Sequence, residues 1–213
     1  MTHPVDILLV LVILLNFLVL GTPSLRMTIR GAALQGVLLA LLPLLVHRGF
    51  GWRVGAIAVA TMALKGLLIP GLLEKAMRDV HIRREVEPYV GFVPSLFLCA
   101  VGTALAILFS GNLPLAPEHA GTLLVPASLA TLLSGFLVLT TRKKAISQVV
   151  GYLILENGIF VFGQLLIEAM PFLVEAGVLL DLFVGIFIMG IVINHIRQEF
   201  SSLDTELLSE LKD

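Results

Sequence analysis

The sequence predicts an all-α protein, a polytopic bundle of about seven transmembrane helices, and three observations lead to this fold class. Hydrophobic residues make up 58% of the 213-residue chain and charged residues only 14%, whereas a soluble domain carries about 25% charged residues. The mean hydropathy is +1.02. Apolar runs recur that are long enough to cross about 30 Å of hydrocarbon. Because lipid offers the backbone no hydrogen-bond partners, these runs are expected to form helices.

Seven apolar segments are expected to span the membrane. They cover approximately residues 5–21, 31–47, 53–73, 90–110, 122–140, 145–168 and 172–196. Most connections are short, but the linker 74–88 mixes both charge signs and is expected to lie at the surface. The chain then divides into an N-terminal three-helix unit (1–80), a linker with the fourth helix (81–120), a C-terminal three-helix unit (121–198) and a cytoplasmic tail (199–213). The tail is acidic and amphipathic, which predicts an interfacial or subunit-contacting helix or, alternatively, a disordered end.

The distribution of lysine and arginine predicts that the N-terminus lies outside and the C-terminus in the cytoplasm. In this orientation eleven basic residues fall on the cytoplasmic side: Arg26, Arg30, Lys75, Arg78, Arg83, Arg84, Arg142, Lys143, Lys144, Arg197 and Lys212. Only Arg48 and Arg53 fall outside, and the remaining cation, Lys65, lies within the third helix. The predicted location is the inner (cytoplasmic) membrane, with lipid surrounding a multi-pass chain.

A faint internal repeat relates the two three-helix units. The segment "TIRGAALQGVLLALLP" can be laid over "KKAISQVVGYLILENG" at an offset of 115 residues, which places Gly36 on Gly151. Both units begin on the same side of the membrane, so the repeat would be a parallel duplication. Chance similarity between leucine-rich helices is the alternative.

Composition also excludes several functions. The net charge of −1 argues against a nucleic-acid partner. The single cysteine, Cys99, excludes a disulfide framework or a cysteine-ligated cluster within this chain. The sequence has no haem-binding signature and no glycine-rich nucleotide turn. We therefore expect no cofactor and no metal site in this chain.

Three ionisable residues, Glu156, Asp181 and Lys65, are predicted to lie near the middle of the bilayer. At about 1.5 Å per residue, Glu156 lies roughly 18 Å beyond Lys144, and Lys65 lies roughly 15 Å from Lys75. A charge in lipid costs on the order of 3 kcal/mol even on the lenient insertion scale, so these groups are expected to face the bundle interior or water. This arrangement predicts a proton relay in which Lys65 contacts at least one carboxylate, directly or through water, because an unpaired buried charge is costly.

Polar neighbours of these charges are candidates for supporting the relay. They are Tyr152, Gln148, Asn157, His195 and Thr61. Gln148, Tyr152 and Glu156 recur every four residues and so share one helix face, while Thr61 precedes Lys65 by one turn. The alternative is structural, because a buried ion pair can lock helices together and glutamine or tyrosine side chains can form helix-packing hydrogen bonds.

Two sequence blocks carry a resemblance to known membrane subunits. The segment "RKKAISQVVGYLILENGIF", followed by a helix that carries Asp181, resembles the small three-helix subunit of respiratory complex I and its counterpart in Mrp-type antiporters. In this resemblance Glu156 takes the place of a mid-membrane glutamate, and Asp181 takes that of a second carboxylate, as aspartate instead of glutamate. The blocks "ALKGLLIP" and "GYLILENG", the seven-helix layout and the length resemble the hydrogenase-4 component E family still more closely. That family is found in membrane-bound [NiFe] hydrogenase and formate hydrogenlyase-type complexes.

The resemblance implies an ion-translocating subunit of a complex-I-like hydrogenase assembly, with no catalysis of its own. Its expected partners are antiporter-like membrane subunits, a membrane anchor subunit and hydrogenase-type peripheral subunits. The [NiFe] centre and the iron–sulfur clusters are expected in those partners. Two alternatives remain open: a stand-alone secondary transporter of a small ion or solute, for which a parallel repeat is suited, and a purely structural membrane anchor.

Overall fold

Helices make up the regular structure of the described part of the chain. The computed structural model describes residues 4–46, 52–79, 88–113, 121–165 and Gly190. Within these ranges the helices are α1 (Pro4–Gly21), α2 (Leu25–Ala40), α3 (Leu42–Val46), α4 (Trp52–Ala63), the π-helical turn η1 (Leu64–Leu68), α5 (Ile69–Asp79), α6 (Phe92–Ser110), α7 (Leu124–Thr141) and α8 (Ala145–Gly163). The all-α fold class is confirmed for these residues, which contain no β-strand.

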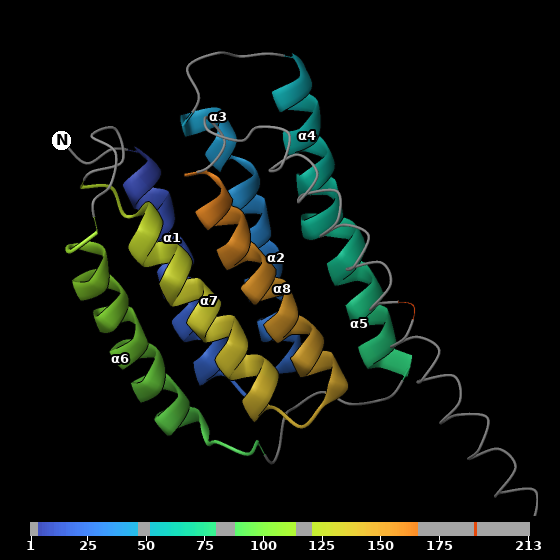
Figure 1. Cartoon of the computed structure of the whole chain (residues 1–213). Helices are drawn as coiled ribbons and strands as arrows, with labels where there is room; N and C mark the ends of the chain where they lie inside the picture. Colours follow the sequence, from blue (N-terminus) through green and yellow to red (C-terminus); the bar gives the residue numbers. More distant parts are fainter. Residues whose placement is uncertain (1–3, 47–51, 80–87, 114–120, 166–189, 191–213) are drawn as a thin grey trace, which may run out of the picture.

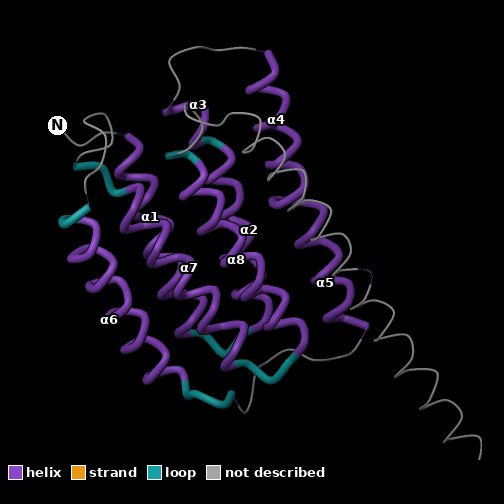
Figure 2. The backbone as a smooth tube through the Cα atoms, viewed as in Figure 1, coloured by secondary structure: helices purple, strands orange, loops and turns teal. Residues whose placement is uncertain are grey.

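The helices run up and down in one bundle (Figure 1). Four of them, α1, α2, α7 and α8, form its centre: α7 packs along α8, α1 along α2 and α7, and α2 along α8. Helix α6 lies against α1 and α7, and the helical path α4–η1–α5 lies against α2. Short loops join α1 to α2 and α7 to α8 at the same end of the bundle (Figure 2).

Five helical segments in the described residues are long and apolar enough to cross a membrane. They are Pro4–Gly21, Leu25–Leu45, Phe92–Ser110, Leu124–Thr141 and Ala145–Gly163. The third predicted segment, 53–73, corresponds to α4, η1 and α5, whose continuous helical path is divided by the π-helical turn. The chain is therefore a membrane protein with transmembrane helices. The seventh predicted segment, 172–196, lies outside the described residues apart from Gly190, so the total of seven stays a prediction.

Two apolar clusters fill the bundle, one toward each end. The cluster near the α1–α2 loop contains Leu20 and Leu25, and the cluster at the opposite end contains Leu9 and Leu42. A layer of buried polar side chains separates the two clusters, and the four central helices supply it: Asn16, Gln35, Thr131, Glu156 and Asn157.

The position of each polar residue along its helix shows this layering. On α1, Asn16 follows Val12 of one cluster and precedes Val19 of the other. On α8, Asn157 lies in the same way between Ile154 and Val161. The bundle therefore places these five polar side chains at one level, away from both helix ends.

Glycines bring α7 and α8 into backbone contact. A Cβ added to Gly151 would lie 2.5 Å from the backbone nitrogen of Leu139, and one added to Gly158 would lie 2.7 Å from that of Leu132. A Cβ added to Gly135 of α7 would likewise lie 2.8 Å from the backbone oxygen of Gly151 on α8. Small residues that allow helices to approach are the usual means of packing in lipid, where no hydrophobic driving force acts between helices. This packing fixes the rotation of α8.

The predicted start of the second helix at residue 31 is wrong. Helix α2 begins at Leu25, six residues earlier. Arg26 and Arg30 interrupt the apolar run of the sequence, but both side chains are exposed, whereas Leu25 and Ile29 are buried. The first turns of α2 are thus amphipathic, and the basic residues lie on the outer face.

The predicted linker 74–88 is also wrong over its first six residues, because α5 continues to Asp79. Ala76 and Met77 are buried in this extension, while Lys75 and Arg78 are exposed. The charges made this segment resemble a loop, yet they occupy one face of a helix.

The sixth predicted helix, 145–168, ends earlier than expected, at Gly163. The N–H groups of Gln164 and Leu165 donate to the carbonyls three residues back, at 3.2 and 3.1 Å. Tightening of the last turn into this 3₁₀ pattern is a common way for a helix to end.

Helices that the predicted repeat would superimpose lie next to each other in the bundle. Helix α1 neighbours α7, and α2 neighbours α8. Asn16 and Thr131, which the offset of 115 residues would superimpose, are hydrogen-bonded to each other. The duplication itself, and the division of the chain into units, stay predictions.

Candidate functional site

Lys65 and Glu156 form an ion pair inside the bundle. The Lys65 Nζ lies 2.7 Å from the Glu156 Oε1, and their side chains are 16% and 4% exposed. Lys65 comes from η1 and Glu156 from α8, so the pair joins two helical paths that are far apart in the sequence. The predicted contact between Lys65 and at least one of the two carboxylates is confirmed, and the partner is Glu156.

The local sequence around Lys65 explains why its helix widens there. Pro70 has no N–H, so the Gly66 carbonyl loses its α-helical donor, and the Ile69 N–H donates to the carbonyl of Leu64, five residues back. π-Helical turns of this kind are frequent at functional sites. The turn places Lys65 in contact with both α2 and α8.

A glycine on α2 makes room for the lysine stem. A Cβ added to Gly36 would lie 2.8 Å from the Lys65 Cβ. Since any larger residue would push η1 away from α2, Gly36 sets the depth to which Lys65 enters the bundle. The ring of Phe160 on α8 lies 5.7 Å from the Lys65 Nζ, within the range of a cation–π contact.

A chain of side-chain amides continues from the ion pair across the bundle. Lys65 donates to the Asn157 Oδ1 at 3.1 Å. The Asn157 Nδ2 donates to the Gln35 Oε1 at 3.2 Å, and the Gln35 Nε2 donates to the Asn16 Oδ1 at 2.9 Å. The Asn16 Nδ2 donates to the Thr131 Oγ1 at 3.0 Å. This chain, from Lys65 to Thr131, is called the amide chain below, and it joins η1, α8, α2, α1 and α7.

Sequence reasoning singled out Asn157 but missed the rest of the amide chain. Asn16, Gln35 and Thr131 are 1%, 1% and 0% exposed. A polar side chain near the middle of an apolar helix is itself a signal of contact between helices. Asn16 and Gln35 carried that signal, but a neutral amide stands out less than a charge because burying it costs less free energy.

The other predicted supporting residues are not part of the amide chain. The Gln148 Nε2 donates to the Arg142 carbonyl at 3.1 Å, so this side chain links the first turn of α8 to the end of α7. Tyr152 is half-buried one turn before Glu156, and Thr61 is half-buried in α4. Asp181 and His195 lie outside the described residues, and their places in the relay stay predictions.

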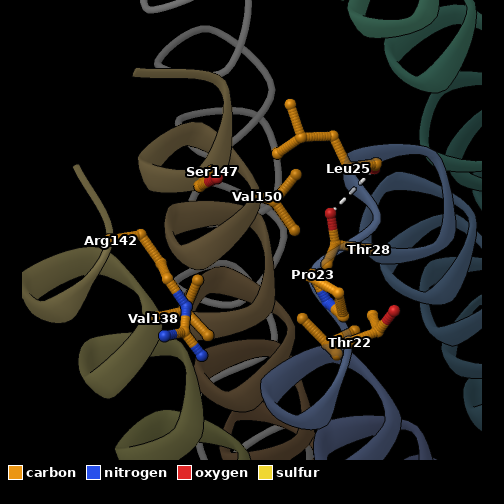
Figure 3. Close-up of a pocket in the computed structure, with 9 residues that line it drawn as sticks. Thr22, Pro23, Leu25, Thr28, Val138, Arg142, Ser147 and Val150 are labelled. Carbon is orange, nitrogen blue, oxygen red and sulfur yellow. Dashed lines mark hydrogen bonds between the residues drawn. The ribbon is translucent and has the colours of Figure 1, made fainter. Parts of the chain in front are cut away.

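Arg142 is a second buried cation, and its contacts are structural. The residue is 3% exposed, and its guanidinium donates to the carbonyls of Val90 and Leu20, each at 2.9 Å. It lies 4.8 Å from the centre of the Phe92 ring. Figure 3 shows Arg142 at a small cavity of about 10 Å³ beside the α1–α2 loop. Arg142 thus ties the end of α1 to the segment before α6.

The site is suited to holding and moving charge. In the described residues no three side chains of histidine, cysteine, aspartate or glutamate come together as a metal site. A buried carboxylate can accept a proton and a buried ammonium can balance its charge, which is the chemistry expected of ionisable residues inside a membrane.

The fold and the site define a class: a polytopic helical membrane protein with a lysine–glutamate pair and an amide chain buried between its helices. The chain belongs to the family of the uncharacterized protein Rv0085 of Mycobacterium tuberculosis (strain ATCC 25618 / H37Rv), with which it shares 34% identity over 205 residues, 94% of this chain and 92% of that protein. It is also similar to hydrogenase-4 component E of Escherichia coli (strain K12) and of Shigella flexneri, at 27% identity over 154 residues, 70% of this chain and 68% of each relative. No family model and no solved structure matches the chain.

Proposed function

We propose that this chain is a proton-translocating membrane subunit of a complex-I-like hydrogenase or related oxidoreductase assembly. The observation that carries the proposal is the buried contact of 2.7 Å between the Lys65 Nζ and the Glu156 Oε1. Similarity to hydrogenase-4 component E supports a place in a multi-subunit membrane complex. Partner subunits would supply the redox chemistry and hold the [NiFe] centre and iron–sulfur clusters.

In the proposed mechanism Glu156 is the group that gains and loses the proton. Protonation of its carboxylate removes the negative partner of Lys65, which leaves a buried cation that attracts another anion or favours release of the proton. Asp181, predicted on the following helix, is the proposed second carboxylate. Lys65 acts by its charge, and it couples the state of Glu156 to the next step.

A small cavity beside Lys65 supports access by water. It has a volume of about 10 Å³ and is lined by Lys65 and Asn157, with Ile29 and Leu73 among its apolar residues. This volume is close to the minimum that one water molecule needs. The cavity lies on the side of Lys65 that faces the end of the bundle where α2 begins and α5 ends, and we propose that water reaches the ion pair from that end when the buried side chains of Ile29 and Leu73 move.

The distribution of charge supports an orientation with this end in the cytoplasm. Seven basic residues lie near it, at the ends of α5 and α7 and the starts of α2 and α8: Arg26, Arg30, Lys75, Arg78, Arg142, Lys143 and Lys144. Cytoplasmic ends carry most lysine and arginine. The N-terminus would then lie outside, and the proton path would begin on the cytoplasmic side.

One observation favours a second candidate, a structural anchor. Every contact from Glu156 to Thr131 joins different helices, so the site also fastens the bundle. In this reading the ion pair contributes to assembly and has no part in transport.

Replacement of Glu156 by glutamine separates the two candidates. We expect Glu156→Gln to keep the shape of the side chain, so the complex assembles in membranes while coupled proton pumping falls at least tenfold. Pumping would be measured in inverted membrane vesicles with a pH-sensitive dye, and assembly by native gel. Glu74→Gln is the matched control, because Glu74 pairs with the exposed Arg30 at the surface. Loss of assembly without a specific pumping defect would favour the anchor.

Purification in mild detergent tests the proposed partners. An affinity tag on this chain should bring down large antiporter-like and hydrogenase-type subunits. A chain that purifies alone and moves an ion or solute in liposomes would instead be a stand-alone transporter.

A further inference from the structure

The amide chain has one direction, and its chemistry allows no other. An ammonium only donates hydrogen bonds, so the Asn157 oxygen must face Lys65 and its nitrogen must face Gln35. At the far side the Gln35 Nε2 also donates to the Val12 carbonyl at 3.2 Å, and a carbonyl only accepts. Both ends therefore impose the same orientation on Asn157, Gln35 and Asn16.

We propose that Asn157, Gln35 and Asn16 are positioning residues that hold Lys65 as an ammonium ion whether Glu156 is charged or neutral. All three amides turn their oxygen atoms toward Lys65 and their N–H groups away from it. Hydrogen bonds that run in one direction polarise one another, and they do so more strongly in a medium of low dielectric constant. This assignment rests on the proposed function, in which Glu156 alternates between the two protonation states.

The hydrogen bond from the Gln35 Nε2 to the Val12 carbonyl keeps the amide chain from reversing its donor–acceptor direction. If Gln35 turned over, its oxygen would face the Val12 carbonyl, and Asn157 would lose the acceptor of its N–H groups. Gln35 and Asn157 are 1% and 2% exposed, and an unsatisfied buried amide is costly. The orientation of Asn157 toward Lys65 is consequently independent of Glu156.

The amides position Lys65 and do not themselves conduct protons. A carboxylate or an amine can exchange a proton with water, whereas asparagine and glutamine side chains do not titrate. In the proposed mechanism protons therefore pass between the carboxylates and water and not through the amides, and Lys65 keeps its charge through the cycle.

The groups that face Lys65 are few. Helix α8 presents Glu156, Asn157 and the Phe160 ring, and α2 presents Gly36, which has no side chain. Among the described residues, Glu156 is the one charged group in contact with the Lys65 ammonium. With Glu156 neutral, the amide chain supplies the remaining acceptor.

Nitrogen NMR of lysine side chains tests the proposal without measuring transport. The full chain would carry ¹⁵N-lysine in lipid nanodiscs at neutral pH, and Lys65→Arg would assign the Lys65 signal by its loss. Glu156→Gln imitates the neutral carboxyl. We expect Lys65 to remain an ammonium in Glu156→Gln, and to become a neutral amine when Glu156→Gln is combined with Gln35→Met, which has similar volume and no amide.

Two further variants make the result decisive. Gln148→Met removes a glutamine of α8 outside the amide chain, and combined with Glu156→Gln it should leave Lys65 an ammonium. Asn157→Leu replaces the amide next to Lys65 and should act as Gln35→Met does, which keeps the test valid if one variant does not fold. A neutral Lys65 in Glu156→Gln alone, or an ammonium in the folded double variants, would overturn the proposal. Neither outcome bears on whether Glu156→Gln abolishes pumping, so the proposed function is judged separately.

Discussion

Lys65 is the cation of the buried ion pair, so its replacement tests how much this pair contributes to stability and to pumping. Its ammonium contacts the Glu156 carboxylate at 2.7 Å. Removal of one partner from a buried ion pair leaves an uncompensated charge, which destabilises a protein by about 3–5 kcal/mol. We expect Lys65→Ala to lower the free energy of unfolding by about that amount and to abolish pumping. Lys65→Arg should lose less, because it keeps the charge and changes the geometry.

Denaturation of the purified chain in mixed micelles would measure both variants. Lys75→Ala is the control, since Lys75 is exposed on α5. Equal losses for the alanine and arginine variants would show that the charge of Lys65 has no role.

Arg142 is buried outside the proposed proton path, so its replacement is expected to change stability alone. Its guanidinium donates to the carbonyls of Leu20 and Val90, and a buried acceptor left without a donor costs about 1–3 kcal/mol. Arg142→Ala should lower the thermal unfolding temperature, and Arg142→Lys should restore only part of the loss because an ammonium lacks the planar fork. Thermal unfolding followed by circular dichroism would measure both. Full recovery by lysine would contradict a role for the guanidinium geometry.

At the scale of elements, the α7–α8 contact depends on the absence of side chains. A Cβ on Gly151 would lie 2.5 Å from the backbone nitrogen of Leu139, and backbone atoms cannot yield as a flexible side chain does. We expect Gly151→Ala to lower the free energy of unfolding by about 1–3 kcal/mol, the usual effect of overpacking. Chemical denaturation in detergent would measure it.

Gly71 provides the matched control for this prediction. A Cβ there meets nothing within 4 Å, and alanine is a better helix former than glycine by about 1 kcal/mol. Gly71→Ala should therefore leave stability unchanged or slightly raised. If both variants lost stability equally, close approach of α7 and α8 would not be the cause.

For the whole molecule, the proposed orientation can be tested by labelling. In a Cys99→Ser background, a cysteine at Asn112 should react with a membrane-impermeant maleimide from the periplasmic side of intact cells. A cysteine at Lys75 should react only after the membrane is opened. Both positions are exposed, at opposite ends of the bundle. The reverse pattern would overturn the orientation and the cytoplasmic entry of protons.

Much of the fold could be predicted because composition controls it. Long apolar runs must form helices in lipid, and α1, α6 and α7 lie within a few residues of the predicted segments 5–21, 90–110 and 122–140. Boundaries failed where charges line one face of a helix, as at the start of α2 and the end of α5. A charged residue beside an apolar run indicates the edge of the membrane, but it does not show whether the chain there forms a loop or continues as an amphipathic helix.

The sequence by itself determined that Lys65 and Glu156 need partners, because the free energy of burying a charge depends on the charge and its depth. It also predicted that Lys65 would contact Glu156 or Asp181, directly or through water, and the structure shows that the partner is Glu156. Only the tertiary structure decided that Asn157, Gln35 and Asn16 continue from that pair, and that Gln148 instead bonds to the end of α7. Which side chains meet depends on how each helix is rotated about its axis. Contacts such as Gly151 against α7 set that rotation, and they form between segments that are distant along the chain.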